Sequence, residues 1–103
     1  MSKEKTESKN TTTHYSVYIL ECSDNSLYTG ITTDIKRRLY EHNHTLKGAK
    51  YTKARRPVKL VYCEKNLSKS DALQREYAIK KLKKIEKLKI IDEKSLENNH
   101  NGC

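Results

Sequence analysis

Apolar residues gather in short runs that turn-forming residues separate. Val17-Tyr18-Ile19-Leu20 and Leu27-Tyr28-Thr29 are rich in β-branched and aromatic residues, and Ser23-Asp24-Asn25-Ser26 lies between them. This order predicts a β-hairpin with a tight connection. A third run, Val58 to Cys63, predicts another strand, with Pro57 at its entrance, where a missing N–H is tolerated.

The helical segments begin at capping residues. Asp34 precedes Ile35-Lys36-Arg37-Arg38-Leu39, so its carboxylate is expected to accept backbone N–H bonds at a helix start rather than to catalyse. Ser68, with Asp71 three residues later, resembles a capping box and predicts a helix through Lys81 or beyond. A last short helix is expected near three apolar residues, Ile85, Leu88 and Ile91.

These elements predict one small domain with a three-stranded sheet. A length of 103 residues suffices for a modest core and not for a second domain. Residues 14–91 are expected to fold, while residues 1–13 and 92–103 are polar and are expected to be disordered tails. Residues 1–13 hold no apolar run, so we expect neither a signal peptide nor a membrane anchor.

The charge of the chain is strongly basic. Lys and Arg outnumber Asp and Glu by 22 to 13, a net charge of +9, which favours a nucleic acid partner over an acidic protein or a neutral metabolite. The alternative is a solvated lysine surface that serves solubility alone. The segment from His44 to Pro57 is expected to be a loop that grips phosphates, with Lys47, Lys50, Tyr51, Lys53, Arg55 and Arg56 as candidate contacts.

The three cysteines, Cys22, Cys63 and Cys103, are too few and too scattered for a disulfide framework or a paired-cysteine zinc site. This usage favours a reducing cytoplasm. Cys22 and Cys63 fall in apolar strand patterns and are expected to be buried.

Several polar and aromatic residues each have a plain structural explanation. Tyr18 and Tyr28 suit a cross-strand pair that fills a core without phenylalanine, and Arg38 suits a surface charge. Glu76 has Lys80 four residues on, a helix-surface pair worth about 0.3–0.5 kcal/mol. However, its other near neighbours are mostly apolar, and a partly desolvated carboxylate requires a cation, hydrogen bonds or a metal.

Histidine spacing argues against a zinc pair. His42 and His44 are two residues apart, which places them on different helix faces. His42 instead shares a face with Arg38, four residues before it, and that face can border a cleft.

Taken together, the order of these residues resembles the GIY-YIG endonuclease family. That family carries a tyrosine pair on a hairpin, a glycine after the second tyrosine, an arginine on the next helix and a glutamate on a later one; the matching residues here are Tyr18, Tyr28, Gly30, Arg38 and Glu76. Ser16 and Val17 replace the first two residues of the first name-giving triplet. The likeness covers roughly Tyr15 to Ile91.

Three segments look like the small, single-domain, uncharacterised bacterial subgroup of that family: Val17-Tyr18-Ile19-Leu20-Glu21-Cys22, Leu27-Tyr28-Thr29-Gly30-Ile31-Thr32 and Gly48-Ala49-Lys50-Tyr51-Thr52. The resemblance implies an α/β domain with a mixed, mainly antiparallel three-stranded sheet flanked by helices. It also implies a metal-dependent endonuclease that hydrolyses phosphodiester bonds in DNA, in repair or processing.

The resemblance also implies roles for single residues. Glu76 would ligate Mg²⁺ or Mn²⁺, and Arg38 would bond a non-bridging phosphate oxygen. Tyr18 would be the general base for the attacking water, its pKa lowered by the metal and by Arg38, and Tyr28 would position that water. Independently of the resemblance, the position of His42 on the face of Arg38 leads us to expect that it touches a phosphate or water.

Gly30 would let the strand pass close to the substrate. Because no recognition helix or zinc finger is visible, selection of a branched, flapped, single-stranded or nicked structure is expected rather than a defined sequence. Ile31 stands where some repair nucleases have a lysine, which fits weak or partner-dependent activity.

Two other functions remain open. A non-catalytic nucleic-acid-binding module would use the same basic surface and keep the tyrosines, Arg38 and Glu76 for packing and ion pairing. A ribosome- or protein-associated accessory domain would instead have a protein partner that survives nuclease treatment.

Overall fold

The computed structural model describes residues 14–97. Residues 1–13 and 98–103, which belong to the two predicted tails, lie outside the described residues. The elements follow one another as β1 (Tyr15–Glu21), β2 (Leu27–Thr32), α2 (Ile35–His44), α3 (Lys50–Lys53), β3 (Lys59–Leu67), α4 (Lys69–Lys80) and α5 (Lys84–Glu97).

The three strands form one sheet in the order β2-β1-β3. The predicted hairpin is confirmed, because β1 pairs antiparallel with β2, and Tyr18 lies opposite Gly30. β3 also pairs antiparallel with β1. The expectation of a mixed sheet is therefore wrong, since both pairings within the described residues are antiparallel.

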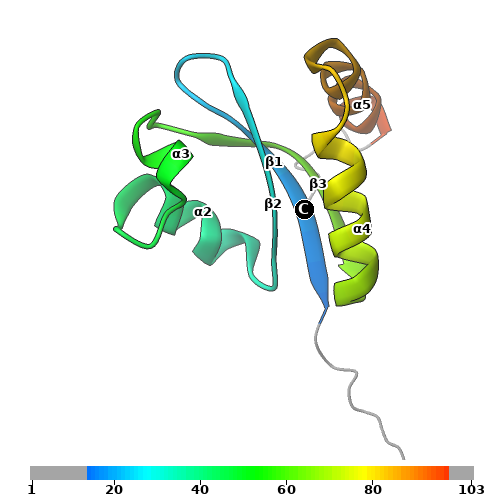
Figure 1. Cartoon of the computed structure of the whole chain (residues 1–103), viewed down its shortest axis with the longest axis horizontal. Coiled ribbons are helices and arrows are strands. Elements are labelled where there is room, and N and C mark those ends of the chain that lie inside the picture. Colours follow the sequence, from blue (N-terminus) through cyan, green and yellow to red (C-terminus); the bar gives the residue numbers. More distant parts are fainter. Residues whose placement is uncertain (1–13, 98–103) are drawn as a thin grey trace, which may run out of the picture.

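The alternation along β1 sends its side chains to two separate cores. Val17 and Ile19 pack in one cluster with Ala72 and Ile79 of α4, whereas Tyr18 and Leu20 pack in another, against residues of α2. Figure 1 shows the same division, with α2 and α3 on one side of the sheet and α4 and α5 on the other. β1 therefore runs through the centre of the molecule.

The predicted helix starts are confirmed by their caps. An Asp34 carboxylate oxygen accepts the Arg37 backbone N–H at 3.0 Å. The Ser68 hydroxyl accepts the Asp71 backbone N–H, also at 3.0 Å, and α4 ends at Lys80. None of these helices is long and apolar enough to cross a membrane, as far as residues 14–97 are concerned.

Two predicted boundaries are corrected. The expected loop from His44 to Pro57 contains the short helix α3. The expected C-terminal tail begins too early, because α5 continues to Glu97. The physical reason is that residues 92–97 contain neither glycine nor proline, so nothing in the sequence stops the helix. β3 also extends past Cys63 to Leu67.

Helix α4 is fixed to the sheet by a polar contact. Arg75 Nε donates to Glu64 Oε2 on β3 at 2.8 Å, and the Tyr62 hydroxyl donates to the same carboxylate. This contact sets the rotation of α4 about its axis and thereby the direction of the next residue, Glu76.

Candidate active site

The centre of the site is Tyr18, in the middle of β1 and only 2% exposed. A Cβ built on Gly30, its partner on the edge strand β2, would lie 2.6 Å from the Tyr18 hydroxyl. The missing side chain of Gly30 therefore makes room for Tyr18. The expectation from the sequence is that the missing side chain lets the strand pass close to a substrate; instead Gly30 is buried, and Tyr18 fills the space beside it.

The Tyr18 hydroxyl is bonded to a buried histidine. His42, on α2, is 0% exposed, and its Nε2 lies 2.8 Å from the Tyr18 hydroxyl oxygen. Its Nδ1 lies 2.8 Å from the Thr52 hydroxyl oxygen of α3. Both ring nitrogens are thus engaged within the protein, which contradicts the expectation that His42 touches a phosphate or water.

Thr52 and Gly48 complete this arrangement, and neither was among the predicted site residues. Thr52 is fully buried and donates its hydroxyl to the Ala49 carbonyl at 2.9 Å. A Cβ on Gly48 would lie 2.7 Å from the Glu41 carbonyl oxygen, so only glycine lets the loop approach α2 this closely. The one sequence signal for both was their presence in the segment Gly48-Ala49-Lys50-Tyr51-Thr52.

Burial controls the protonation of the central pair. Burial, and then the nearby Tyr28, raise the pKa of Tyr18 to about 12, although Arg38 acts in the opposite direction. Burial, and then Arg38, lower the pKa of His42 to about 4. Near neutral pH Tyr18 is therefore a neutral phenol and His42 a neutral imidazole. Arg38 by itself does not lower the pKa of Tyr18 below its ordinary value.

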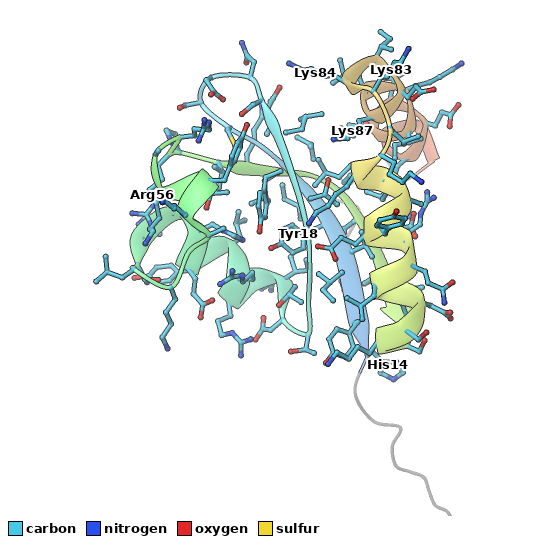
Figure 2. The ribbon with its side chains drawn as sticks, in the orientation of Figure 1. His14, Tyr18, Arg56, Lys83, Lys84 and Lys87 are labelled. Atoms are coloured by element: carbon cyan, nitrogen blue, oxygen red, sulfur yellow. The ribbon has the colours of Figure 1, made fainter. Side chains whose placement is uncertain are left out.

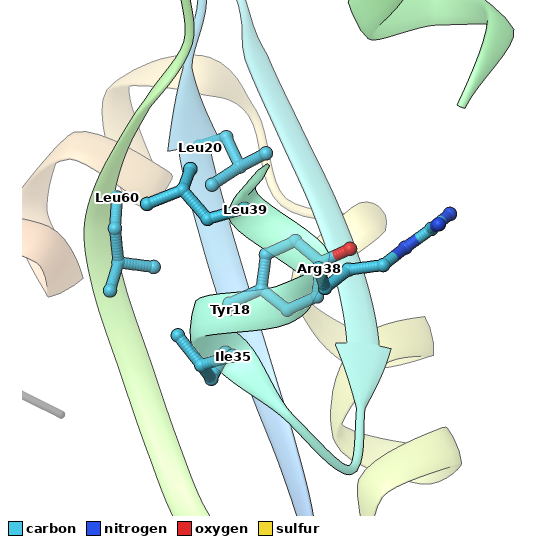
Figure 3. A pocket seen from close by; sticks show the side chains of 6 residues that line it. All are labelled: Tyr18, Leu20, Ile35, Arg38, Leu39 and Leu60. Carbon is cyan, nitrogen blue, oxygen red and sulfur yellow. The ribbon is translucent and has the colours of Figure 1, made fainter. Parts of the chain in front are cut away.

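Arg38 is held beside this pair by its own contacts. Its Nη1 donates to Glu41 Oε1 and to the Lys47 carbonyl, both at 2.9 Å. Figure 3 shows the Tyr18 ring among the aliphatic side chains of Leu20, Ile35, Leu39 and Leu60, while Arg38 extends away from them. The side chain remains 26% exposed, so part of the guanidinium can reach a ligand.

Glu76 comes from the opposite face of the sheet. Its carboxylate is 20% exposed and pairs with Lys80 Nζ at 3.2 Å, which is the plain partner that the sequence suggested. Its charge nevertheless also acts on Tyr18, whose pKa it raises as a minor contribution. Arg38 and Glu76 thus both influence the pKa of Tyr18, with Glu76 the weaker of the two, although α2 and α4 cover different faces of the sheet.

Tyr28 begins a row of aromatic rings that runs from His42 to Tyr51. Its ring centre lies 5.3 Å from that of His42 and 6.1 Å from that of Tyr51, and the planes of the two tyrosine rings are 23° apart. The Arg55 guanidinium lies over Tyr51, 3.8 Å from the ring centre, and Arg55 Nε bonds Asp24 at 3.0 Å. The rings therefore lead outward from the buried Tyr18 to Tyr51, which is 38% exposed.

The basic segment divides into two groups. Lys47, Lys50 and Lys53 are exposed and can meet a phosphate. Arg56 has a structural contact instead, because its guanidinium donates to carbonyls at the end of α2, among them that of His42 at 2.6 Å. Figure 2 shows Arg56 on the far side of α3 from Tyr18.

The donors present fit a metal that the substrate helps to hold. Among the described residues no three His, Cys, Asp or Glu side chains gather as a ligand set. His42 is unsuited because both of its nitrogens are engaged. Glu76 offers one partly exposed carboxylate, a ligand that hard divalent cations prefer.

Comparisons with known proteins show the family to which the chain belongs. The family model described as the GIY-YIG catalytic domain matches residues 14–89. A UPF0213 protein of Staphylococcus haemolyticus is 58% identical over 81 residues, 79% of this chain and 96% of that protein. A UPF0213 protein of Syntrophus aciditrophicus is 60% identical over 75 residues, 73% of this chain and 86% of that protein.

Solved structures show the same fold. The solution structure of a UPF0213 protein from Bacillus halodurans is 44% identical and gives a TM-score of 0.52, covering 79% of this chain and 85% of that one. A protein of E. faecalis is 41% identical with a TM-score of 0.57, covering 85% of this chain and 93% of that one.

The fold and the tyrosine pair thus define a small α/β domain of the nuclease-like GIY-YIG class. The chain belongs to the GIY-YIG family and, within it, to the UPF0213 group of small bacterial proteins.

Proposed function

We propose that this protein is a metal-dependent endonuclease that hydrolyses phosphodiester bonds in DNA, with a preference for structure over sequence and a role in repair or processing. The observation that carries the proposal is the Tyr18 hydroxyl, bonded to His42 Nε2 at 2.8 Å and acted on by the charges of Arg38 and Glu76. Packing alone does not require a buried histidine and an arginine beside a buried phenol.

The contacts of His42 give Tyr18 a way to act as a base despite a pKa of about 12. Thr52 donates to the Ala49 carbonyl, so its oxygen is free to accept from Nδ1–H, and Nε2 then accepts from the Tyr18 hydroxyl. In this tautomer Tyr18 can take a proton from the attacking water while it passes its own to His42. The negative charge of a bound phosphate would offset the burial that otherwise disfavours the imidazolium. A free phenolate is then never required.

The other tautomer has a weaker basis. The Ala49 N–H points at His42 Nδ1 at 3.3 Å, which would place the imidazole proton on Nε2. The Thr52 and Tyr18 contacts, both 2.8 Å, are shorter and favour the proton on Nδ1.

Arg38 and Glu76 would act on the phosphate. The guanidinium is permanently charged and would bond a non-bridging oxygen as negative charge builds up on it. GIY-YIG proteins typically depend on a metal, and Glu76 would hold Mg²⁺ or Mn²⁺. Such an ion supplies positive charge that stabilises the scissile phosphate and the leaving oxygen. Lys80 would release the carboxylate when the ion binds.

The first experiment measures cleavage of labelled duplex, single-stranded, flapped and branched DNA with Mg²⁺ or Mn²⁺. We expect Glu76→Gln and Arg38→Ala to lose cleavage by about 100-fold or more, a loss typical of removed transition-state charge. Glu93→Gln on α5 and Arg37→Ala on α2 are matched controls, since both side chains are exposed, and they should cut like the wild type. Equal cleavage by Glu76→Gln would refute the assigned role.

A second candidate function is a nucleic-acid-binding module without catalysis. The ion pair of Glu76 with Lys80 favours it, because this contact satisfies the carboxylate without a metal. A module of this kind binds the same substrates in chelator, never cuts them, and is insensitive to Glu76→Gln.

A further inference from the structure

A hollow of about 240 Å³ lies between β2, α3 and the two C-terminal helices. Its walls are Leu27, Tyr28 and Thr29 of β2, Tyr51 of α3, Lys80 of α4 and Lys87 of α5. A hydrogen bond from Lys84 Nζ to the Asn25 carbonyl, at 2.7 Å, ties the start of α5 to the turn before β2. Figure 2 shows Lys83, Lys84 and Lys87 together at that end of α5.

The hollow adjoins the candidate active site through two shared residues. Tyr28 lines it and also contacts His42, with 5.3 Å between the ring centres. Lys80 lines it and also pairs with Glu76. A group in the hollow would therefore lie beside a phosphate bound at Arg38 and Glu76.

The chemistry of the walls indicates what kind of group fits. Tyr28 and Tyr51 form an aromatic wall with planes only 23° apart, and Leu27 adds apolar surface. Both charged side chains in the lining, Lys80 and Lys87, are cations. An aromatic wall with cations beside it suits a planar base joined to a phosphate.

Thr29 of β2 also lines the hollow. It is 4% exposed, and its hydroxyl is the one buried side-chain polar atom that lacks a hydrogen-bond partner among the described residues. Because this oxygen is itself buried, the groups that a ligand in the hollow can reach are the rings and the lysines.

We propose that this hollow holds one unstacked nucleotide of the substrate strand, next to the cleaved bond, with its base against Tyr51 and its phosphate at Lys87. The proposal rests on the proposed function, because it needs a nucleic acid strand at Tyr18. The volume fits a single base, since pockets for drug-sized ligands measure about 300–1,000 Å³. The requirement for an unstacked nucleotide would favour single-stranded or flapped ends over intact duplex.

Tyr51 is held in place for this contact. Arg55 covers one face of its ring, 3.8 Å from the ring centre, and also donates to the Tyr51 carbonyl at 3.0 Å, so a base would meet the other face. A ring already fixed loses little freedom when a base stacks on it, so the binding energy is not spent on ordering the wall.

The test measures binding in chelator, where no cleavage occurs, by using short DNA strands with one 2-aminopurine. Stacking quenches this base, so we expect quenching by the wild type and by Tyr51→Phe. Tyr51→Ala should lose the quenching and bind roughly 5- to 100-fold more weakly, the range for one lost base–aromatic contact. Lys87→Ala should weaken binding and reduce the salt slope by about 0.7.

Two exposed residues outside the hollow serve as matched controls. Tyr40, 60% exposed on α2, and Lys89, two residues beyond Lys87, should tolerate alanine with affinity and quenching unchanged. Thermal melting checks that every variant is folded. The proposal is overturned if Tyr51→Ala binds and quenches like the wild type, if Tyr40→Ala loses as much, or if no strand is bound.

Failure of the proposed function is distinguishable from failure of the hollow. If the protein binds DNA and quenches the probe through Tyr51 but never cuts, the nucleotide site in the hollow stands and the proposed nuclease function is refuted. If the protein cuts DNA and Tyr51→Ala binds like the wild type, the nuclease function stands and the nucleotide site in the hollow is refuted.

Discussion

At the scale of single residues, the decisive contact is between a phenol and an imidazole that are both buried. Burial favours the neutral form of each, and so raises the pKa of Tyr18 while it lowers that of His42. The cost of burying these polar groups is offset by the hydrogen bonds that join Tyr18, His42 and Thr52. The protonation of Tyr18 therefore depends on two residues that are themselves buried, His42 and Thr52.

Thr52 tests this dependence as a positioning residue. Thr52→Val keeps the shape of the side chain but removes the oxygen that faces His42 Nδ1, so we expect a stability loss of about 1–3 kcal/mol in urea unfolding. Cleavage should fall about tenfold or more in kcat with little change in KM. Thr52→Ser restores the hydroxyl and should restore kcat. An unchanged kcat in Thr52→Val, with stability lost, would reduce Thr52 to a packing role.

His42 makes stability depend on pH. Its folded pKa of about 4 lies below the ordinary 6.5, so as the pH falls the unfolded chain binds a proton first. The free energy of unfolding should therefore have its full value above pH 6.5. It should decrease as the pH falls from 6.5 to 4, by up to about 3 kcal/mol. His42→Gln cannot take up this proton, and urea unfolding at both pH values should show a shallower decrease. Parallel curves for both proteins would contradict the prediction.

At the scale of elements, the loop after α2 positions the residues around Tyr18 as much as α2 itself does. It carries Thr52, which bonds His42. The hairpin, the Asp34 cap and the Ser68 cap follow from local sequence, because each depends on residues only a few positions apart. The position of α3 against α2 does not follow from any periodicity. It depends on Gly48, whose missing side chain lets the loop lie against the backbone of α2.

Gly48 tests this contact. In Gly48→Ala the new methyl group meets the Glu41 carbonyl oxygen at 2.7 Å and the His42 Cα at 2.9 Å. Both are backbone atoms that cannot swing aside, so we expect a loss of about 1–3 kcal/mol in urea unfolding. Gly30→Ala is a matched control, since there the methyl group meets the Tyr18 side chain. In a Tyr18→Leu background the cost of Gly30→Ala should fall, whereas that of Gly48→Ala should not.

At the scale of the whole molecule, the dominant feature is an excess of positive charge. The net charge of +9 favours polyanions, and exposed lysines lie both on the loop around α3 and at the start of α5. The arginines of the loop add less positive charge for binding a polyanion than their number suggests. Arg55 is paired with Asp24, and Arg56 donates to carbonyls at the end of α2.

Salt dependence tests this distribution. DNA binding in chelator should weaken steeply as salt rises, with a slope of about 0.7–0.9 per phosphate neutralised. Lys50→Ala should reduce the slope by about one such unit, whereas Arg56→Lys should leave it nearly unchanged and instead lower the melting temperature, since it loses bonds to α2. Binding that is insensitive to salt would point to a protein partner instead.

The sequence by itself determined the strands, the helix starts and the residues that mark the GIY-YIG family, because alternation, caps and motif order are local properties of the chain. Only the tertiary structure decided that His42 faces Tyr18 rather than solvent, that Arg56 serves the end of α2, and that Gly30 makes room for a ring. These outcomes depend on contacts between distant residues, such as the 24 positions that separate Tyr18 from His42. No local pattern encodes which side chain will fill a given space once the elements pack together.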